Sequence, residues 1–244
     1  MKLTLIKTCL ISLFYLVFSN QNTELYGRSG DESQTLLKDV ITAEVQASLT
    51  PAEVINEFKA GNQRFLHNNL TPRDFASQVQ KTANGQFPKA AVLSCVDSRV
   101  PVEYVFDQGI GDIFVARVAG NFINEDLLGS AEFACKVSGS KVLLVMGHES
   151  CGAVKAAIDN VKLGNITPML DKIHPAVEKS QDFKGEKSSK NAEFVSYVVE
   201  NNVKHTLETI RQKSPILKEM EDKGEIKIVG AIYSLRTGAV TFLE

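Results

Sequence analysis

The chain has 244 residues, of which 43% are hydrophobic and 23% are charged, so it can bury a sizeable core and is not broadly disordered. Its 27 Lys and Arg residues against 29 Asp and Glu residues give a net charge of -2, which excludes a strongly basic nucleic-acid-binding surface, and we expect no nucleic-acid partner. Its 4 cysteines are too few for a disulfide scaffold.

The first segment, residues 1–19, has the pattern of a signal peptide. Lys2 and Lys7 provide a positive start, the apolar run 8–18 is too short to span a bilayer comfortably, and small residues precede a cleavage site after Ser19. We therefore expect a periplasmic or secreted protein with no stable membrane insertion once the signal is removed. An N-terminal membrane anchor is the alternative.

Residues 20–49 are predicted to form an N-terminal extension. It begins polar and rich in Gly and Ser, and its apolar residues over 36–49 have helical spacing. Thr50, followed by Pro and then Glu53, is typical of a capped helix start, and a second short helix is predicted after Pro72.

The domain 50–244 alternates apolar runs with amphipathic segments. The continuous apolar runs predict strands buried on both faces, at 90–95, 113–118, 141–147 and 226–233. The segments between them predict helices at 125–137, 149–162 and 191–213. This alternation predicts an α/β fold with a central, mostly parallel β-sheet flanked by helices, preceded by the N-terminal helical extension.

Two short motifs follow the first and third predicted strands. They are Cys95-Val96-Asp97-Ser98-Arg99 and His148-Glu149-Ser150-Cys151-Gly152. Open parallel sheets place their ligand sites at the carboxyl ends of the strands. If these two strands are neighbours, both motifs meet at one edge of the sheet.

Cys95, His148 and Cys151 form a set of two thiolates and one imidazole, which is a combination that selects zinc. Three protein ligands leave the fourth tetrahedral position for water, as in catalytic zinc sites. Two buried thiols or a disulfide would also account for Cys95 and Cys151, but would leave His148 beside them unexplained.

Asp97 and Arg99 are two residues apart, so in an extended turn both side chains can point the same way. The guanidinium of Arg99 can then bind the Asp97 carboxylate through a fork and keep it ionised. Held in this way, Asp97 can accept a hydrogen bond from zinc-bound water. Without Arg99 it could become the fourth zinc ligand itself. An ordinary ion pair is the alternative.

With these motifs the chain resembles a β-class carbonic anhydrase from about residue 53 to 243. The segments 117–121 and 230–233 add to the resemblance. It implies one zinc ion per subunit, held by Cys95, His148 and Cys151, and a catalytic dyad of Asp97 and Arg99. It also implies that Asp97 ligates zinc in a closed form.

The resemblance implies further contacts to carbon dioxide and bicarbonate. Gln86 matches a glutamine that hydrogen-bonds bicarbonate across a dimer interface, Phe114 matches an apolar wall, and Gly152 is expected at the substrate. Phe133 replaces a tyrosine of plant-like members, so a hydroxyl contact is lost there. We expect a homodimer or a higher homo-oligomer.

The implied reaction is the reversible hydration of carbon dioxide to bicarbonate and a proton, in which zinc-bound hydroxide attacks carbon dioxide and Asp97 and Arg99 orient the hydroxide. Because two thiolates add negative charge to the metal, we expect activity to rise toward alkaline pH. Two alternatives stay open: a carbon disulfide or carbonyl sulfide hydrolase on the same fold, and a zinc-stabilised binding protein without turnover.

Overall fold

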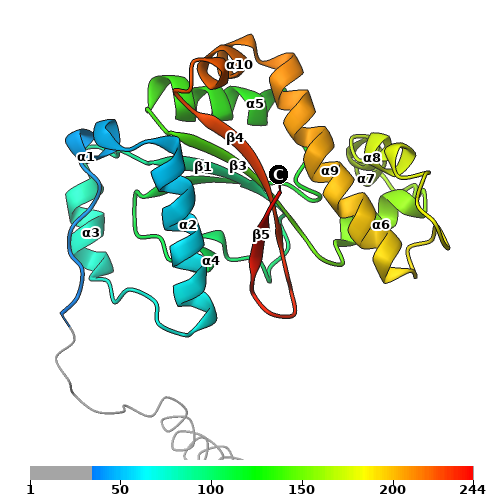
Figure 1. The fold of residues 1–244 in the computed structure, drawn as a ribbon, viewed down its shortest axis with the longest axis horizontal. Helices are drawn as coiled ribbons and strands as arrows, with labels where there is room; N and C mark the ends of the chain where they lie inside the picture. Colours follow the sequence, from blue (N-terminus) through cyan, green and yellow to red (C-terminus); the bar gives the residue numbers. More distant parts are fainter. Residues whose placement is uncertain (1–34, 244) are drawn as a thin grey trace, which may run out of the picture. The chain divides into compact units, whose positions relative to one another are not determined.

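The strands form one sheet in the order β2-β1-β3-β4-β5, within a computed structural model that describes residues 35–243 (Figure 1). They are β1 (Ala90–Ser94), β2 (Ile113–Arg117), β3 (Val142–His148), β4 (Lys227–Tyr233) and β5 (Val240–Phe242). β2, β1, β3 and β4 pair in parallel, and β5 pairs with β4 in antiparallel fashion. The predicted mostly parallel sheet is confirmed. The short strand β5 was not predicted.

Helices connect and flank the strands. They are α1 (Ala43–Ser48), α2 (Pro51–Leu66), α3 (Phe75–Thr82), α4 (Val102–Val105), α5 (Glu125–Glu132), the π-helix η1 (Phe133–Val137), α6 (Gly152–Ile158), α7 (Ile166–Leu170), α8 (His174–Lys179), α9 (Ala192–Lys213) and α10 (Pro215–Asp222). The Thr50 hydroxyl oxygen accepts a hydrogen bond from the Glu53 N–H, and the Glu53 carboxylate accepts one from the Thr50 N–H. The predicted capping box of α2 is therefore confirmed.

Each face of the sheet is covered by its own set of helices. On one face, Val54 and Phe58 of α2 pack with residues of α4 against alternate side chains of β1, β3 and β4. On the other face, α5, η1, α9 and α10 pack against the remaining side chains of the same strands. In Figure 1, α2 and α9 lie to either side of the strands. Because both faces are covered, every residue of β1 and β3 is buried, as their continuous apolar sequence predicts.

A third apolar cluster lies beyond the carboxyl ends of β1 and β3. It joins the N-terminal half of α9 to α6, α7 and α8, and it includes Cys95 and Cys151. Cys95 and Cys151 are therefore buried among apolar side chains where the central strands end.

Two of the predicted helical segments are shorter in the structure. Residues 36–41 are not helical, because Leu37 pairs with the chain just before α3: its N–H donates to the Pro72 carbonyl at 2.8 Å and its carbonyl accepts from the Asp74 N–H at 3.0 Å. Only α1, capped by Thr42, remains of the predicted segment 36–49. The helix predicted at 149–162 is shorter, since Ser150 has a φ of 52°, which a helix does not accept.

The expected signal peptide, 1–19, and residues 20–34 of the expected extension lie outside the described residues. Among residues 35–243, no helix combines the length and the apolar character needed to cross a bilayer.

Candidate metal centre

The parallel pairing of β1 with β3 brings the two sequence motifs together. Ser94, the last residue of β1, is in register with Met146 of β3. Cys95 follows directly, His148 is the last residue of β3, and Cys151 is the cap residue before α6. All three predicted ligands therefore lie at the same edge of the sheet, where neighbouring parallel strands give way to loops.

The three side chains form a cluster of metal-ligand dimensions. The ligand atoms of Cys95, His148 and Cys151 all lie within 4.8 Å of one another, and the two Sγ atoms are 4.0 Å apart. In a tetrahedral zinc site with Zn–S bonds of about 2.3 Å, two sulfurs are roughly 3.8 Å apart, so the spacing suits zinc. The three residues are 4%, 0% and 1% exposed, which leaves them buried together.

The imidazole of His148 is held in the tautomer that a metal ligand needs. Its Nδ1 lies 2.9 Å from the Glu149 carbonyl oxygen, so Nδ1 carries the proton and donates it there. Nε2 is left with a free lone pair, is buried, and has no hydrogen-bond partner among the described residues. A buried nitrogen without a partner beside two sulfurs fits a metal ion and has no other evident purpose.

The two thiols differ in their proton affinity. The Cys151 thiol hydrogen-bonds Cys95, and the Gly120 N–H adds to this, so that the pKa of Cys95 is lowered to about 4 despite burial. The neighbouring Cys95 thiolate and burial raise the pKa of Cys151. One thiol of the pair therefore loses its proton more readily than the other, and a cation is needed for both sulfurs to be charged together.

The Asp97 carboxylate lies next to the cluster but is bound by Arg99 and not by the cluster residues. Arg99 grips its carboxylate through Nη2 at 2.7 Å and Nε at 2.9 Å, and the Arg99 backbone N–H donates to it at 3.0 Å. These bonds keep the pKa of Asp97 well below its usual range. One carboxylate oxygen lies 3.8 Å from Nε2 of His148, next to the position that a metal would occupy.

Arg117 has a contact that the sequence did not reveal. This last residue of β2 donates from Nε to the Cys95 carbonyl at 2.8 Å and from Nη2 to the Asp97 carbonyl at 2.5 Å. It therefore fixes the backbone of the loop that carries both a ligand and the carboxylate. The resemblance included Arg117 without a role. Its register partner Ser94, next to Cys95, is the feature that indicates one.

The remaining predicted residues do not join the cluster. Gln86 is exposed and precedes β1, at the opposite edge of the sheet from Cys95. Gly152 is the exposed first residue of α6, and a side chain there would meet no other atoms.

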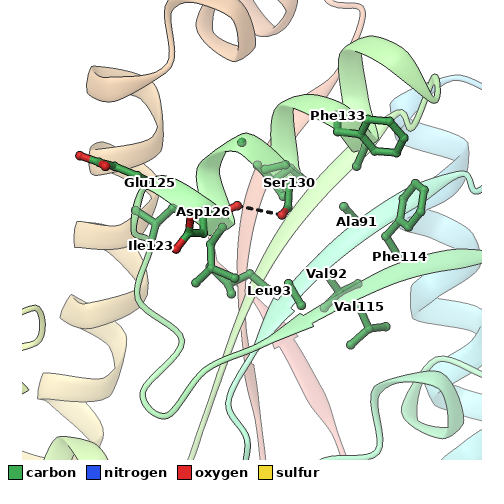
Figure 2. A pocket seen from close by; sticks show the side chains of 16 residues that line it. Ala91, Val92, Leu93, Phe114, Val115, Ile123, Glu125, Asp126, Ser130 and Phe133 are labelled. Atoms are coloured by element: carbon green, nitrogen blue, oxygen red, sulfur yellow. Dashed lines mark hydrogen bonds between the residues drawn. The ribbon is translucent and has the colours of Figure 1, made fainter. Parts of the chain in front are cut away.

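Phe114 lies on the edge strand β2 and lines a largely apolar cavity of about 670 Å³ between β1, β2 and α5 (Figure 2). Its ring faces that of Phe133 edge-on, with centroids 6.2 Å apart. None of the three ligands lines this cavity. Figure 2 shows the two rings together at one end and Glu125 and Asp126 at the other.

The chain is similar in sequence to known proteins. The family model described as carbonic anhydrase matches residues 90–240. Carbonic anhydrase 2 of Mycobacterium tuberculosis is 33% identical over 197 residues, which cover 77% of this chain and 90% of that protein.

Solved structures are also similar. A β-carbonic anhydrase of Aspergillus fumigatus superposes with a TM-score of 0.60 at 30% identity, covering 79% of this chain and 89% of that one. A β-carbonic anhydrase of Sordaria macrospora, described as tetrameric, has the same fold, with a TM-score of 0.60 at 22% identity, covering 79% of this chain and 94% of that one.

We expect the purified protein to bind one zinc ion per chain, and Cys151→Ser to lose it, because two ligands do not hold the ion in this geometry. Zinc content by elemental analysis checks this. Cys135→Ala is the control, since Cys135 is buried in a different apolar cluster, which includes residues of α5 and β3 and none of the three predicted ligands. Equal zinc in the wild type and Cys151→Ser would contradict the assignment.

Proposed function

The chain belongs to the β class of the carbonic anhydrase family, and we propose that it catalyses the zinc-dependent, reversible hydration of carbon dioxide to bicarbonate and a proton. The buried cluster of Cys95, His148 and Cys151 beside the Asp97 carboxylate carries the proposal. Three ligand atoms with a carboxylate held off the fourth position form an arrangement for catalysis, since a purely structural zinc site has four protein ligands.

The cluster fits zinc in residue type, in spacing and in the free Nε2 of His148. A zinc ion bound there supplies the Lewis acidity that makes water a nucleophile near neutral pH. Two cysteine thiolates place more negative charge beside the attacking water than neutral imidazoles would, so the water loses its proton only at higher pH. We therefore propose that activity rises toward alkaline pH.

Asp97 orients the attacking water. Its carboxylate stays ionised across the working range, because Arg99 lowers its pKa. An ionised carboxylate is only an acceptor, so it accepts a hydrogen bond from the water and points a lone pair of the water oxygen toward carbon dioxide. Arg99 thereby has two effects: it keeps Asp97 charged and it holds Asp97 away from the metal position.

We propose that the substrate contacts are completed by a second copy of the chain. Gln86 and Cys95 lie at opposite ends of the five-residue strand β1, which is roughly 16 Å long, so Gln86 does not reach its own cluster. Phe114 pairs with Ala91, near the same end as Gln86. Both therefore contact bicarbonate or carbon dioxide in the site of a neighbouring subunit, while Gly152 contacts it within its own.

Exposed apolar side chains near β2 support this assembly. β2 has only β1 as a neighbour within residues 35–243. Phe133, whose ring meets Phe114 of β2, and Val137 of the same helix η1 are 52% and 71% exposed. An open strand edge flanked by large apolar side chains is typical of an interface. We propose a homodimer as the minimal unit, with higher homo-oligomers built from it.

We also propose that the protein is exported, with cleavage after Ser19, as its N-terminal sequence predicts. The intact mass of protein from the periplasm or medium should then correspond to a chain that starts at Asn20. Full-length protein retained in the membrane fraction would instead indicate an anchor.

Stopped-flow measurement at about pH 8.5 should show rapid hydration of carbon dioxide that a zinc chelator abolishes. We expect Asp97→Ala to lower kcat by roughly 100- to 10,000-fold with zinc retained, because the nucleophile loses its orientation. Asp222→Ala, an exposed carboxylate on α10, is the control and should leave kcat unchanged.

The pH profile and the alternative substrates belong to the same test. Activity should rise from pH 6 to 9 without a contribution from Asp97, which is already ionised at pH 6. A flat profile contradicts the ionisation of water as the controlling step. A zinc-loaded protein that hydrates no carbon dioxide but hydrolyses carbon disulfide or carbonyl sulfide has the alternative activity, and one that turns over none of these is a binding protein.

Mixed oligomers test the contribution of Gln86 across subunits. Cys151→Ser chains have Gln86 but no metal site, and Gln86→Ala chains have the metal site but no glutamine. We expect hetero-oligomers of the two, isolated through different tags, to regain activity at one site for each pair of chains, because a twofold interface is reciprocal. Activity no higher than that of the Gln86→Ala protein alone would place Gln86 outside the neighbouring site.

A further inference from the structure

A buried amide on α9 lies close to the metal cluster. Asn202 is 1% exposed, and its neighbours on the same helix face, Val198, Val199 and Val203, are fully or almost fully buried apolar residues. Burying an amide among such residues destabilises the fold unless the amide is hydrogen-bonded. Its Nδ2 donates to the Gly120 carbonyl at 2.7 Å, and its Oδ1 has no partner within residues 35–243. The hydrogen bond to the Gly120 carbonyl is therefore the one interaction by which an amide differs from an apolar side chain at this position.

Gly120 in turn contacts a metal ligand. Its backbone N–H donates to Sγ of Cys95 at 3.4 Å. Its φ is 81°, and an added Cβ would clash with Cδ1 of Ile173, so no other residue fits without a rearrangement. Glycine also has the widest backbone freedom, which means that its N–H points at the sulfur only while the peptide groups around it are held.

We propose that Asn202 is a positioning residue of the metal centre: its amide holds the Gly120 carbonyl, so that the Gly120 N–H stays directed at Sγ of Cys95. An N–H donor withdraws electron density from a thiolate and sets how much charge the sulfur gives to a metal. Asn202 thus acts on the ligand through one peptide segment, without touching the ligand, the metal position or the substrate.

Thr206, one helical turn further along α9, provides the comparison. It is 2% exposed, and its hydroxyl lies 2.9 Å from the Asn202 carbonyl and 3.4 Å from the Asn121 carbonyl. It therefore contacts the same loop from the same helix face, but it is not bonded to Gly120. Loss of its hydroxyl removes a buried hydrogen bond without releasing the donor to Cys95.

The test replaces zinc by cobalt(II) in the full-length protein and compares Asn202→Leu with Thr206→Val. Leu has the same branched arrangement of four side-chain heavy atoms as Asn, and it has no donor. We expect the thiolate-to-cobalt charge-transfer band to move to longer wavelength in Asn202→Leu, because the sulfur becomes a stronger electron donor. The band should stay in place in Thr206→Val.

An unchanged band in Asn202→Leu would overturn the proposal, and so would an equal shift in both variants, which would indicate general loosening of the loop. Asn202→Ala serves the same comparison if the Leu variant does not fold. The inference rests on the metal-dependent function proposed above, but its readout does not require turnover. A cobalt protein that shows the expected shift while the zinc protein hydrates no carbon dioxide contradicts the proposed function and supports the role of Asn202.

Discussion

The parallel pairing of β1 with β3 is the interaction on which the chemistry of this chain depends. Cys95 comes from one strand and His148 and Cys151 from the end of the other, so they meet only in the observed register. A slip of one residue would turn each side chain of β1 to the opposite face and would move Cys95 out of the cluster. The helices on both faces hold that register, because every residue of both strands is buried.

Contacts from residues that are not predicted metal ligands also hold the site in place. The Glu149 carbonyl fixes the tautomer of His148, Arg99 holds the Asp97 carboxylate, and Arg117 binds the two carbonyls of the loop between Cys95 and Asp97. None of these groups is a predicted metal ligand, yet each restrains a ligand, the Asp97 carboxylate or the loop that carries them. A site arranged in this way needs little rearrangement when the substrate arrives, which is the main source of catalytic power in polar active sites.

Local sequence patterns predicted what depends on neighbours along the chain. The four longer strands follow from continuous apolar runs, and the cluster of Cys95, His148 and Cys151 follows from residue types placed at strand ends. The patterns failed where distant segments decide the structure: residues 36–41 have helical spacing but pair with the chain near Pro72, and β5 is only three residues long and forms by pairing with β4. The role of Arg117 could not be predicted for the same reason, because its hydrogen-bond partners are carbonyl groups in the loop after another strand.

The separation of the ligands along the chain also orders events during biogenesis. Between Cys95 and His148 the chain builds α4, β2, α5 and η1, so the cluster forms only after a long loop has closed and β1 has paired with β3. Zinc binding by all three residues would therefore follow the pairing of β1 with β3. A chain that crosses a membrane before folding would take its zinc from the destination compartment, and the supply of free metal there would limit how many molecules mature.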